Sequence, residues 1–298
     1  MVKTYLDSII NSTESPLSYD PEVENTYTNI ISSLAPVLEE NHQLIYKGVL
    51  ERLIEQNDLH EIFTPKADNG FAITHKLSGH GLVYFMQEML ADKYITLAGK
   101  TAIVSGSDPL ALHTMTKLHE LKVKILGCSD DAGVIHDPYG IDLSLIKRIK
   151  SDQTTSLEHY LLSYPDAIYI KNPSVIWHIP CQIALACSPE IALTNNDVIK
   201  LVEGGCIALV EGNDLSTSSK NIQYLINNNV LYSPFKATDL TSITSSEASI
   251  LTDYKLESIM KKTYTTCKTL ANKYGYRDHL SIGANIARFE QASRLLIN

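Results

Sequence analysis

The chain has no surplus of positive charge and no long apolar run. Its 25 lysines and arginines are outnumbered by 34 aspartates and glutamates, which gives a formal net charge of −9. A nucleic-acid-binding surface needs clustered Lys and Arg to neutralise phosphates, so nucleic acid is not an expected partner. No apolar run reaches the roughly 18 residues of a membrane-spanning helix, and no signal-peptide core follows Met1. We therefore expect a cytoplasmic chain that does not contact a membrane.

The cysteines and histidines lack the spacing of metal sites. Five cysteines, an odd number without a C-x-x-C motif, predict reduced and buried thiols and no zinc site. Cys187 is a candidate nucleophile, but no base lies near it in the sequence, which favours a buried structural role. The ten histidines form no H-x-x-x-H pair, and we interpret His75, His80, His113 and His119 as surface or hydrogen-bonded core residues.

Short β-rich runs alternate with helical stretches between Gly99 and Tyr232. This alternation predicts an α/β fold of the Rossmann type, with a doubly wound, mostly parallel sheet covered by helices on both faces. The apolar spacing predicts one helix over 43–55 in the N-terminal part and further helices after 245. We expect an N-terminal helical domain over 1–78 and a Rossmann-like domain with C-terminal helices over 79–298.

The stretch from Gly99 to Gly133 follows the plan of a dinucleotide-binding βαβ unit, namely strand, glycine turn, helix, strand and acid. Gly106 and Ser107 are candidate phosphate-binding residues in the turn. Asp130 lies about 20 residues further on, where such units carry the acid that binds the ribose. Asp131 beside it disfavours a 2′-phosphate. Two alternatives remain for Asp130: a retained ribose site, or a strand-end turn with solvated acids, which we favour.

One position of this unit departs from the pattern. Asp108 stands where the second glycine is expected, and Pro109 follows it. A side chain at this position blocks the approach of the pyrophosphate, and Pro109 removes an N–H donor. Asp followed by Pro is also a strong helix start, with Asp at the N-cap. We favour a self-capped helix, in which the Asp108 carboxylate takes the place of a ligand phosphate.

Four segments carry a resemblance to a known family: Ser78-Gly79-His80-Gly81, Ile179-Pro180-Cys181, Glu211-Gly212-Asn213 and Gly283-Ala284-Asn285-Ile286-Ala287. They are similar to the T-G-Y-G, I-P-C-D, A-E-G-A-N and G-A-N-I-A motifs of glutamate dehydrogenases of the hexameric, NADP-type branch. With the helical region at 20–61, the resemblance covers most of the chain. It implies a Rossmann domain for NAD(P), with Ser78, Gly106, Ser107, Asp130 and Asn213 as degenerate remnants of the cofactor site and Ser246 as a remnant of the substrate site.

The resemblance also shows departures from the family. Family members carry a large amino-acid-binding portion before the T-G-Y-G motif, with the catalytic lysine and aspartate, but only a short stretch separates Phe63 from Ser78. Residues 1–78 are therefore interpreted as a remnant of that domain, and no residue is assigned a catalytic role. Asp108, Asp214 and Asp239 replace neutral family residues around the cofactor cleft, where their charge should repel a dinucleotide.

Three interpretations follow. The first is a glutamate dehydrogenase-like pseudoenzyme without a cofactor, which acts through protein contacts with its own copies or with a full-length glutamate dehydrogenase. The second is an oxidoreductase of the amino-acid dehydrogenase family that retains altered NAD(P) binding. The third is a decaying product without a selected role. We favour the first, because the strands and core helices are kept while the cofactor site is altered.

Overall fold

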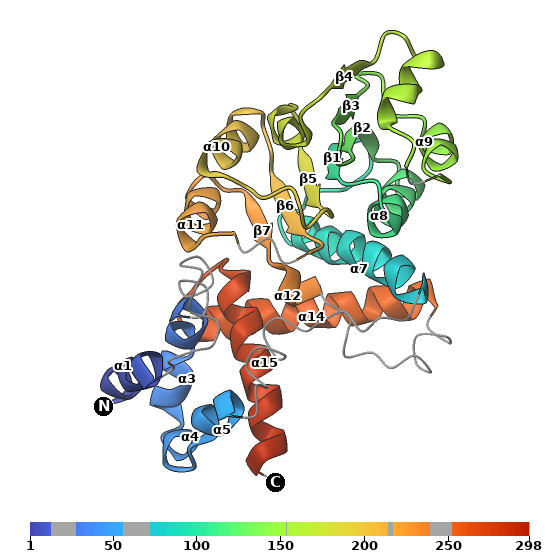
Figure 1. Ribbon diagram of the computed structural model, residues 1–298. Helices are drawn as coiled ribbons and strands as arrows, with labels where there is room; N and C mark the ends of the chain where they lie inside the picture. Colours follow the sequence, from blue (N-terminus) through green and yellow to red (C-terminus); the bar gives the residue numbers. More distant parts are fainter. Residues whose placement is uncertain (13–27, 56–71, 153, 214–216, 239–251, 298) are drawn as a thin grey trace. The chain divides into compact units, whose positions relative to one another are not determined.

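The computed structural model describes residues 1–12, 28–55, 72–152, 154–213, 217–238 and 252–297 (Figure 1). The chain divides into two compact units. Unit 1 comprises Met1–Ala67, Ser218–Lys220 and Thr265–Asn298, and unit 2 comprises Asp68–Thr217 and Asn221–Tyr264. This division groups the C-terminal residues with the N-terminal helices, whereas the sequence places them with the Rossmann-like domain. The boundary between 78 and 79 stays a prediction.

Unit 2 is an α/β fold around one seven-stranded sheet. Its strands are β1 (Thr101–Ser105), β2 (Lys124–Ser129), β3 (Val134–His136), β4 (Ile168–Ile170), β5 (Ile183–Ala186), β6 (Ala208–Glu211) and β7 (Leu231–Ser233). Its helices are α7 (Ala72–Ala91), α8 (Pro109–Glu120), α9 (Leu143–Ile149), α10 (Asn195–Glu203), α11 (Ser219–Asn227, except its first two residues), α12 (Phe235–Thr238) and the beginning of α14 (Asp253–Lys273), with the 3-10 helices η1 (Leu157–Leu162) and η2 (Pro173–His178).

The strand order is β4-β3-β2-β1-β5-β6-β7. The pairs β2–β1, β1–β5, β5–β6 and β6–β7 are parallel, whereas β3 and β4 are antiparallel to their neighbours. The predicted doubly wound, mostly parallel sheet is thus confirmed. After β1 the chain builds β2 on one side and later β5 on the other, so β1 and β5 form the switch point at which α/β folds bind ligands.

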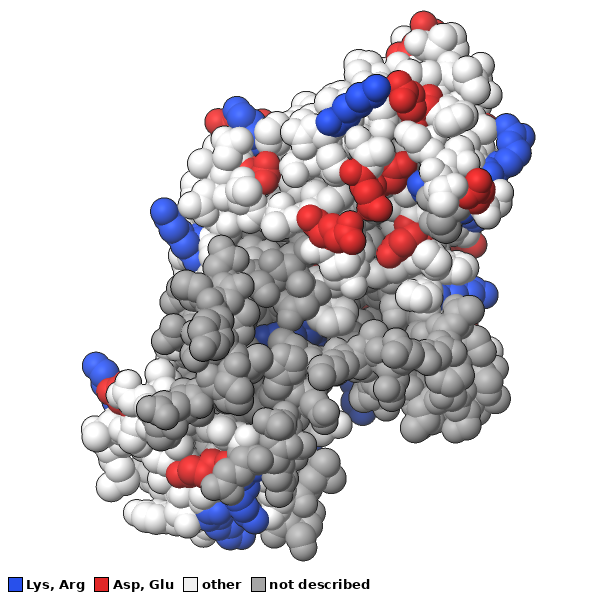
Figure 2. All heavy atoms as spheres, viewed as in Figure 1, with Lys and Arg blue, Asp and Glu red and all other residues white. Residues whose placement is uncertain are grey.

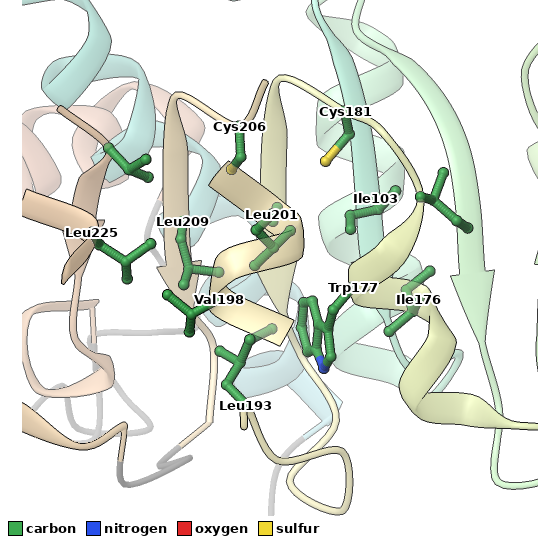
Figure 3. Close-up of a cluster of buried hydrophobic side chains, with 14 of the residues drawn as sticks. Ile103, Ile176, Trp177, Cys181, Leu193, Val198, Leu201, Cys206, Leu209 and Leu225 are labelled. Carbon is green, nitrogen blue, oxygen red and sulfur yellow. The ribbon is translucent and has the colours of Figure 1, made fainter. Parts of the chain in front are cut away.

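The two faces of the sheet are covered by different helices. Alternate strand residues such as Ile103, Ala184 and Leu209 belong to a core cluster with side chains of η2, α10 and α11. Figure 3 shows Trp177 of η2 in this cluster, near Val198 and Leu201 of α10. Helices α7 and α8 pack on the opposite face, where they contact β6 and β1 (Figure 1). Both faces of the central strands β1, β5 and β6 are buried, which explains why these strands are mostly apolar.

Unit 1 is helical in its described part. It contains α1 (Val2–Ser12), α3 (Ala35–Glu40), α4 (Gln43–Tyr46), α5 (Val49–Glu55), the end of α14 and α15 (Leu280–Ile297). Apolar residues from α1 to α5 form one core with Ile286, Phe289 and Ala292 of α15. The single helix predicted over 43–55 is wrong, because Gly48 has a φ of +58° and separates α4 from α5.

Candidate functional site

The loop after β1 has the backbone conformation of a glycine turn, but its Gly106 N–H donates a hydrogen bond within the protein. Gly106 has a φ of +94°, which a side chain would strain. Its N–H donates a hydrogen bond to Ser129 Oγ at 2.8 Å, at the end of β2. Ser107 is buried beside it. The turn is therefore connected to the neighbouring strand by its own amide.

Ser105 connects this loop to the end of β5. Its Oγ accepts hydrogen bonds from the N–H groups of Cys187 and Ser188, at 3.0 and 3.2 Å. A β-carbon on Gly106 would lie 3.4 Å from Ser188. Ser105 was not singled out from the sequence, because its partners lie more than 80 residues away and no local pattern marks them. These hydrogen bonds connect the end of β1 to the loop after β5.

Asp108 caps α8, as the sequence predicts. Its backbone is extended, with φ −71° and ψ 176°, and Oδ1 accepts the N–H of Ala111 at 2.8 Å. Burial raises the pKa of Asp108, and the hydrogen bond from Ala111 opposes part of this effect. Pro109 occupies the first helical turn, where its missing N–H leaves no donor unsatisfied. The carboxylate thus lies at the positive end of the helix dipole, where a bound phosphate lies in a dinucleotide fold.

We expect Asp108→Ala to lower the free energy of unfolding by about 1 kcal/mol, because the N–H of Ala111 loses its acceptor. Asp108→Asn is the matched control, since an Asn side chain caps as well as Asp. Urea unfolding monitored by the fluorescence of Trp177, the single tryptophan, measures both variants. If Asp108→Ala and Asp108→Asn lower the free energy of unfolding equally, capping is not the role of Asp108.

Asp130 is buried and held by the chain itself. Its Oδ1 accepts the N–H groups of Ala132 and Gly133 at 3.1 and 3.0 Å. Its Oδ2 accepts the N–H of Leu157 at 3.0 Å and lies 3.2 Å from Lys150 Nζ. The predicted turn with solvated acids is therefore wrong for Asp130, whose side chain is 8% exposed.

The expectation of a solvated acid holds for the next residue, Asp131, which is exposed. The sequence gives no local sign of the difference, because Lys150 and Leu157 are brought to Asp130 from 20 and 27 residues away. Lys150 is the residue that sequence reasoning missed here. The two acids at the end of β2 thus have opposite environments. Asp130 is buried and bonded to other parts of the chain, whereas Asp131 faces solvent.

The end of β6 lies beside the end of β5. Asn213 donates its side-chain N–H to the carbonyl oxygen of Cys187. Glu211 is buried and accepts hydrogen bonds from Thr217 Oγ1 and, at 3.4 Å, from the N–H of Phe235. The cofactor-site candidates Gly106, Ser107, Asp130 and Asn213 are thus brought to one edge of the sheet, at the carboxyl ends of β1, β2 and β6.

Three other predicted residues, Asp214, Asp239 and Ser246, lie outside the described residues. The acidic wall that Asp214 and Asp239 are expected to form with Asp108 therefore stays a prediction, as does Ser246 as a remnant of the substrate site. Within the described part, Asp131 is close enough to Asp108 to raise its pKa, after the larger effect of burial. Figure 2 shows Asp and Glu side chains close together on the visible face of unit 2.

Ser78 lies half-buried in α7, and the next residue brings α7 very close to α8. A β-carbon on Gly79 would lie 2.8 Å from the backbone nitrogen of Thr114 and 3.0 Å from the carbonyl oxygen of Leu110. Close packing of α7 against α8 therefore requires a glycine at position 79. This explains the first glycine of the Ser78-Gly79-His80-Gly81 motif.

A charge cluster around the buried Lys117, with two half-exposed carboxylates, was not predicted near this crossing. Lys117 Nζ lies 2.8 Å from Asp253 Oδ2 and 2.7 Å from Glu120 Oε2. Burial alone lowers the pKa of Lys117, but its hydrogen bonds to both carboxylates outweigh this effect and raise it. His80 Nδ1 lies 3.2 Å from Asp253 Oδ1, and burial lowers the pKa of His80. His80 is thus a hydrogen-bonded core histidine, as the sequence predicts.

The cysteines are all buried, in agreement with the prediction. Burial raises the pKa of Cys187, and its Sγ lies 3.6 Å from Thr114 Oγ1. A buried thiol with a raised pKa is a poor nucleophile. Among the described residues, no group of three His, Cys, Asp or Glu side chains could hold a metal ion, and no helix is long and apolar enough to cross a membrane.

Comparison with known proteins identifies the family. The family model for Glutamate/Leucine/Phenylalanine/Valine dehydrogenase matches residues 70–296. The chain belongs to this dehydrogenase family. It is 32% identical over 238 residues to the NADP-specific glutamate dehydrogenase of Helicobacter pylori, covering 74% of this chain and 53% of the relative. The chain therefore spans about half the length of the curated relatives that it matches.

Solved glutamate dehydrogenases agree with this assignment. The chain resembles glutamate dehydrogenase 2 of Plasmodium falciparum with 32% identity and a TM-score of 0.69, over 76% of this chain and 52% of that one. A second structure, titled glutamate dehydrogenase, has a TM-score of 0.83 at 17% identity and covers 99% of this chain and 98% of that one. The second likeness concerns the fold alone, and the resemblance inferred from the sequence motifs is confirmed.

Proposed function

We propose that this member of the dehydrogenase family is a non-catalytic protein that acts through contacts with other chains. The observation that carries the proposal is the Asp108 carboxylate at the N-terminus of α8, 2.8 Å from the N–H of Ala111. A dinucleotide phosphate at this helix terminus would have to displace the carboxylate or lie beside it, and the two negative charges would repel each other.

The ribose end of the cleft supports the same conclusion. The Asp130 carboxylate already accepts hydrogen bonds from three backbone N–H groups and forms an ion pair with Lys150. All four partners belong to the same chain. A ribose hydroxyl would have to compete with these donors. The N–H of Gly106 is likewise engaged, by Ser129. Asp108, Asp130 and Gly106, among the described residues of the cleft, therefore do not fit NAD(P), the cofactor that the family resemblance implies.

The substrate side gives a third argument. The family resemblance implies a catalytic lysine and aspartate in the amino-acid-binding portion, and no residue of this sequence matches them. Oxidation of an amino acid through an imine requires a tuned base beside the nicotinamide. We infer that the chain supplies neither the cofactor site nor the base for this reaction.

Titration with NADH and with NADPH tests the cofactor part of the proposal. We expect no saturable change in nicotinamide fluorescence up to millimolar concentrations, while an intact glutamate dehydrogenase in the same assay gives one. The retained positive φ of Gly106 favours a second candidate function, an altered nucleotide site. Saturable binding of either nucleotide would establish this second function and overturn the first.

The activity part is tested with Asp108→Gly, which restores the glycine that the motif expects at this position. We expect no measurable glutamate oxidation by the natural chain or by this variant, because the substrate residues are absent as well. The assay follows NAD(P)H absorbance with glutamate and either cofactor. Turnover in either protein would contradict the proposal.

The contact part is tested by mixing the chain with a full-length glutamate dehydrogenase and measuring the masses of the complexes formed. We expect association, either with the full-length enzyme or between copies of this chain. A chain that stays monomeric and binds nothing would contradict a function through contacts.

A further inference from the structure

Two of the five buried cysteines lie side by side at the amino ends of neighbouring strands. Strands β5 and β6 are parallel, and their register places Ile183 beside Ala208. Cys181 precedes Ile183 by two residues, and Cys206 precedes Ala208 by two residues. The register of the two strands, continued towards their amino ends, therefore places Cys181 beside Cys206.

Backbone contacts before the two strands show that this register continues. The N–H of Ile207 donates a hydrogen bond to the carbonyl oxygen of Gln182 at 2.8 Å. A β-carbon on Gly204 would lie 3.2 Å from the α-carbon of Pro180. Neighbouring strands lie about 4.8 Å apart, which is within the range of roughly 4.4–6.8 Å between the α-carbons of a disulfide. The two segments are thus held at a separation that a disulfide can bridge.

The two cysteine side chains also enter the same core. Cys181 and Cys206 belong to the apolar cluster of Trp177 and Leu201, with exposed fractions of 4% and 5%, and Figure 3 shows them at the same end of this cluster. The hydrogen bond between their thiols is the largest cause that raises the pKa of Cys181, and burial adds to it. The Cys206 thiol donates its own hydrogen bond to the carbonyl oxygen of Ala208 at 3.3 Å. The two free thiols are therefore in contact.

The other three cysteines have different neighbours. Burial is the largest cause that raises the pKa of Cys128, Cys187 and Cys267, and no cysteine is among the groups of the described chain that shift these pKa values. Cys187, for example, contacts Thr114. A lone buried thiol that is oxidised to a sulfenic acid has no second thiol beside it to form a disulfide. Only the pair of Cys181 and Cys206 meets this requirement within the described residues.

We propose that Cys181 and Cys206 form a reversible disulfide when the protein reacts with hydrogen peroxide. One thiolate attacks the peroxide, the O–O bond breaks, and a sulfenic acid and water form. The second thiol then attacks the sulfenic sulfur, so that the S–S bond forms, the S–O bond breaks and a second water molecule leaves with the remaining proton. The two sulfurs together lose two electrons, and the peroxide gains them.

This pair is independent of the candidate cofactor cleft. It lies at the amino ends of β5 and β6, whereas the cleft lies at the carboxyl ends of the strands. The proposal therefore goes beyond the contact function and does not depend on whether the chain binds a nucleotide. The disulfide closes a loop that contains β5 and α10, which lowers the entropy of the unfolded chain. The oxidised protein should therefore unfold at a higher urea concentration than the reduced protein.

Counting free thiols after peroxide treatment of the folded, full chain tests the proposal. The treatment is prolonged and mildly alkaline, because burial and the raised pKa of Cys181 keep the reactive thiolate scarce. The protein is then unfolded and alkylated with iodoacetamide, and its mass is measured. We expect three of the five cysteines to be alkylated and one linked peptide pair, Cys181 with Cys206, in a digest without reductant. Dithiothreitol should restore all five thiols, since it reduces a disulfide but not a sulfinic acid.

Cys181→Ala and Cys206→Ala should each keep all four remaining thiols after the same treatment. Cys267→Ala is the matched control, because it removes an equally buried cysteine of unit 1, and this variant should still lose two thiols. The fluorescence of Trp177, in the same core cluster, verifies that each variant is folded.

Three results would overturn the proposal. The first is a natural chain that keeps all five thiols, and the second is a linked peptide that contains any other pair. The third is an oxidised protein whose urea midpoint is not higher than that of the reduced protein, because the fold would then not hold the two cysteines at bonding distance.

Discussion

Replacement of Lys150 by Met should lower the free energy of unfolding by about 3–5 kcal/mol, because the buried carboxylate of Asp130 loses its counter-charge. The two side chains are 5% and 8% exposed, and Nζ lies 3.2 Å from Oδ2. Lys150 also donates a hydrogen bond to the carbonyl oxygen of Thr155 at 3.0 Å. Urea unfolding monitored by Trp177 fluorescence measures the loss.

Two variants separate the buried charge from a general effect of losing a lysine. Lys200→Met removes a surface pair with Glu203 and should cost about 0.5 kcal/mol or less. The double variant Asp130→Asn/Lys150→Met removes both charges and should be more stable than Lys150→Met alone. If Lys150→Met lowers the free energy of unfolding no more than Lys200→Met does, the buried carboxylate of Asp130 does not need Lys150 as its counter-charge.

Trp177→Ala should destabilise unit 2 by about 3–5 kcal/mol, because it leaves a large cavity in the core that covers one face of the sheet. Trp177 is fully buried, and its neighbours in this core include Ile103 of β1 and Leu201 of α10 (Figure 3). The loss should appear in thermal unfolding followed by circular dichroism, since this variant has no tryptophan left to observe.

Trp177→Phe is the control for this prediction. The indole Nε1 has no hydrogen-bond partner among the described residues, so phenylalanine loses packing volume but no hydrogen bond. We expect Trp177→Phe to lower the free energy of unfolding by less than half as much as Trp177→Ala does. Equal losses in the two variants would mean that the indole ring, and not the filled volume, stabilises this core.

Much of the fold follows from local patterns. The apolar runs predict the strands because both faces of a parallel sheet are buried, and Asp108-Pro109 predicts the start of α8 because capping involves only a few adjacent residues. The helix predicted over 43–55 shows where such patterns fail. Its apolar spacing continues through Gly48, but the positive φ of this residue separates two helices.

The candidate site was predictable only in part. The motif places Gly106 and Asp130 at the ends of adjacent strands, and the structure brings both to one edge of the sheet. The surroundings of Asp130 were misjudged, because its partners Lys150 and Leu157 come from α9 and η1. The cluster of Lys117, His80 and Asp253 was missed for the same reason, since α14 begins more than 130 residues after α8 begins.

The sequence by itself determined the family, the alternation of strands and helices between Gly99 and Tyr232, and the cap that Asp108 places on α8. Each of these depends on residue types at short spacing, which a linear chain displays directly. Only the tertiary structure decided whether a charge is solvated or buried. Asp130 and Asp131 are adjacent and chemically alike, but folding brings Lys150 to one of them and leaves the other in solvent. Burial and ion pairing are properties of what surrounds a side chain, and distant residues supply those surroundings.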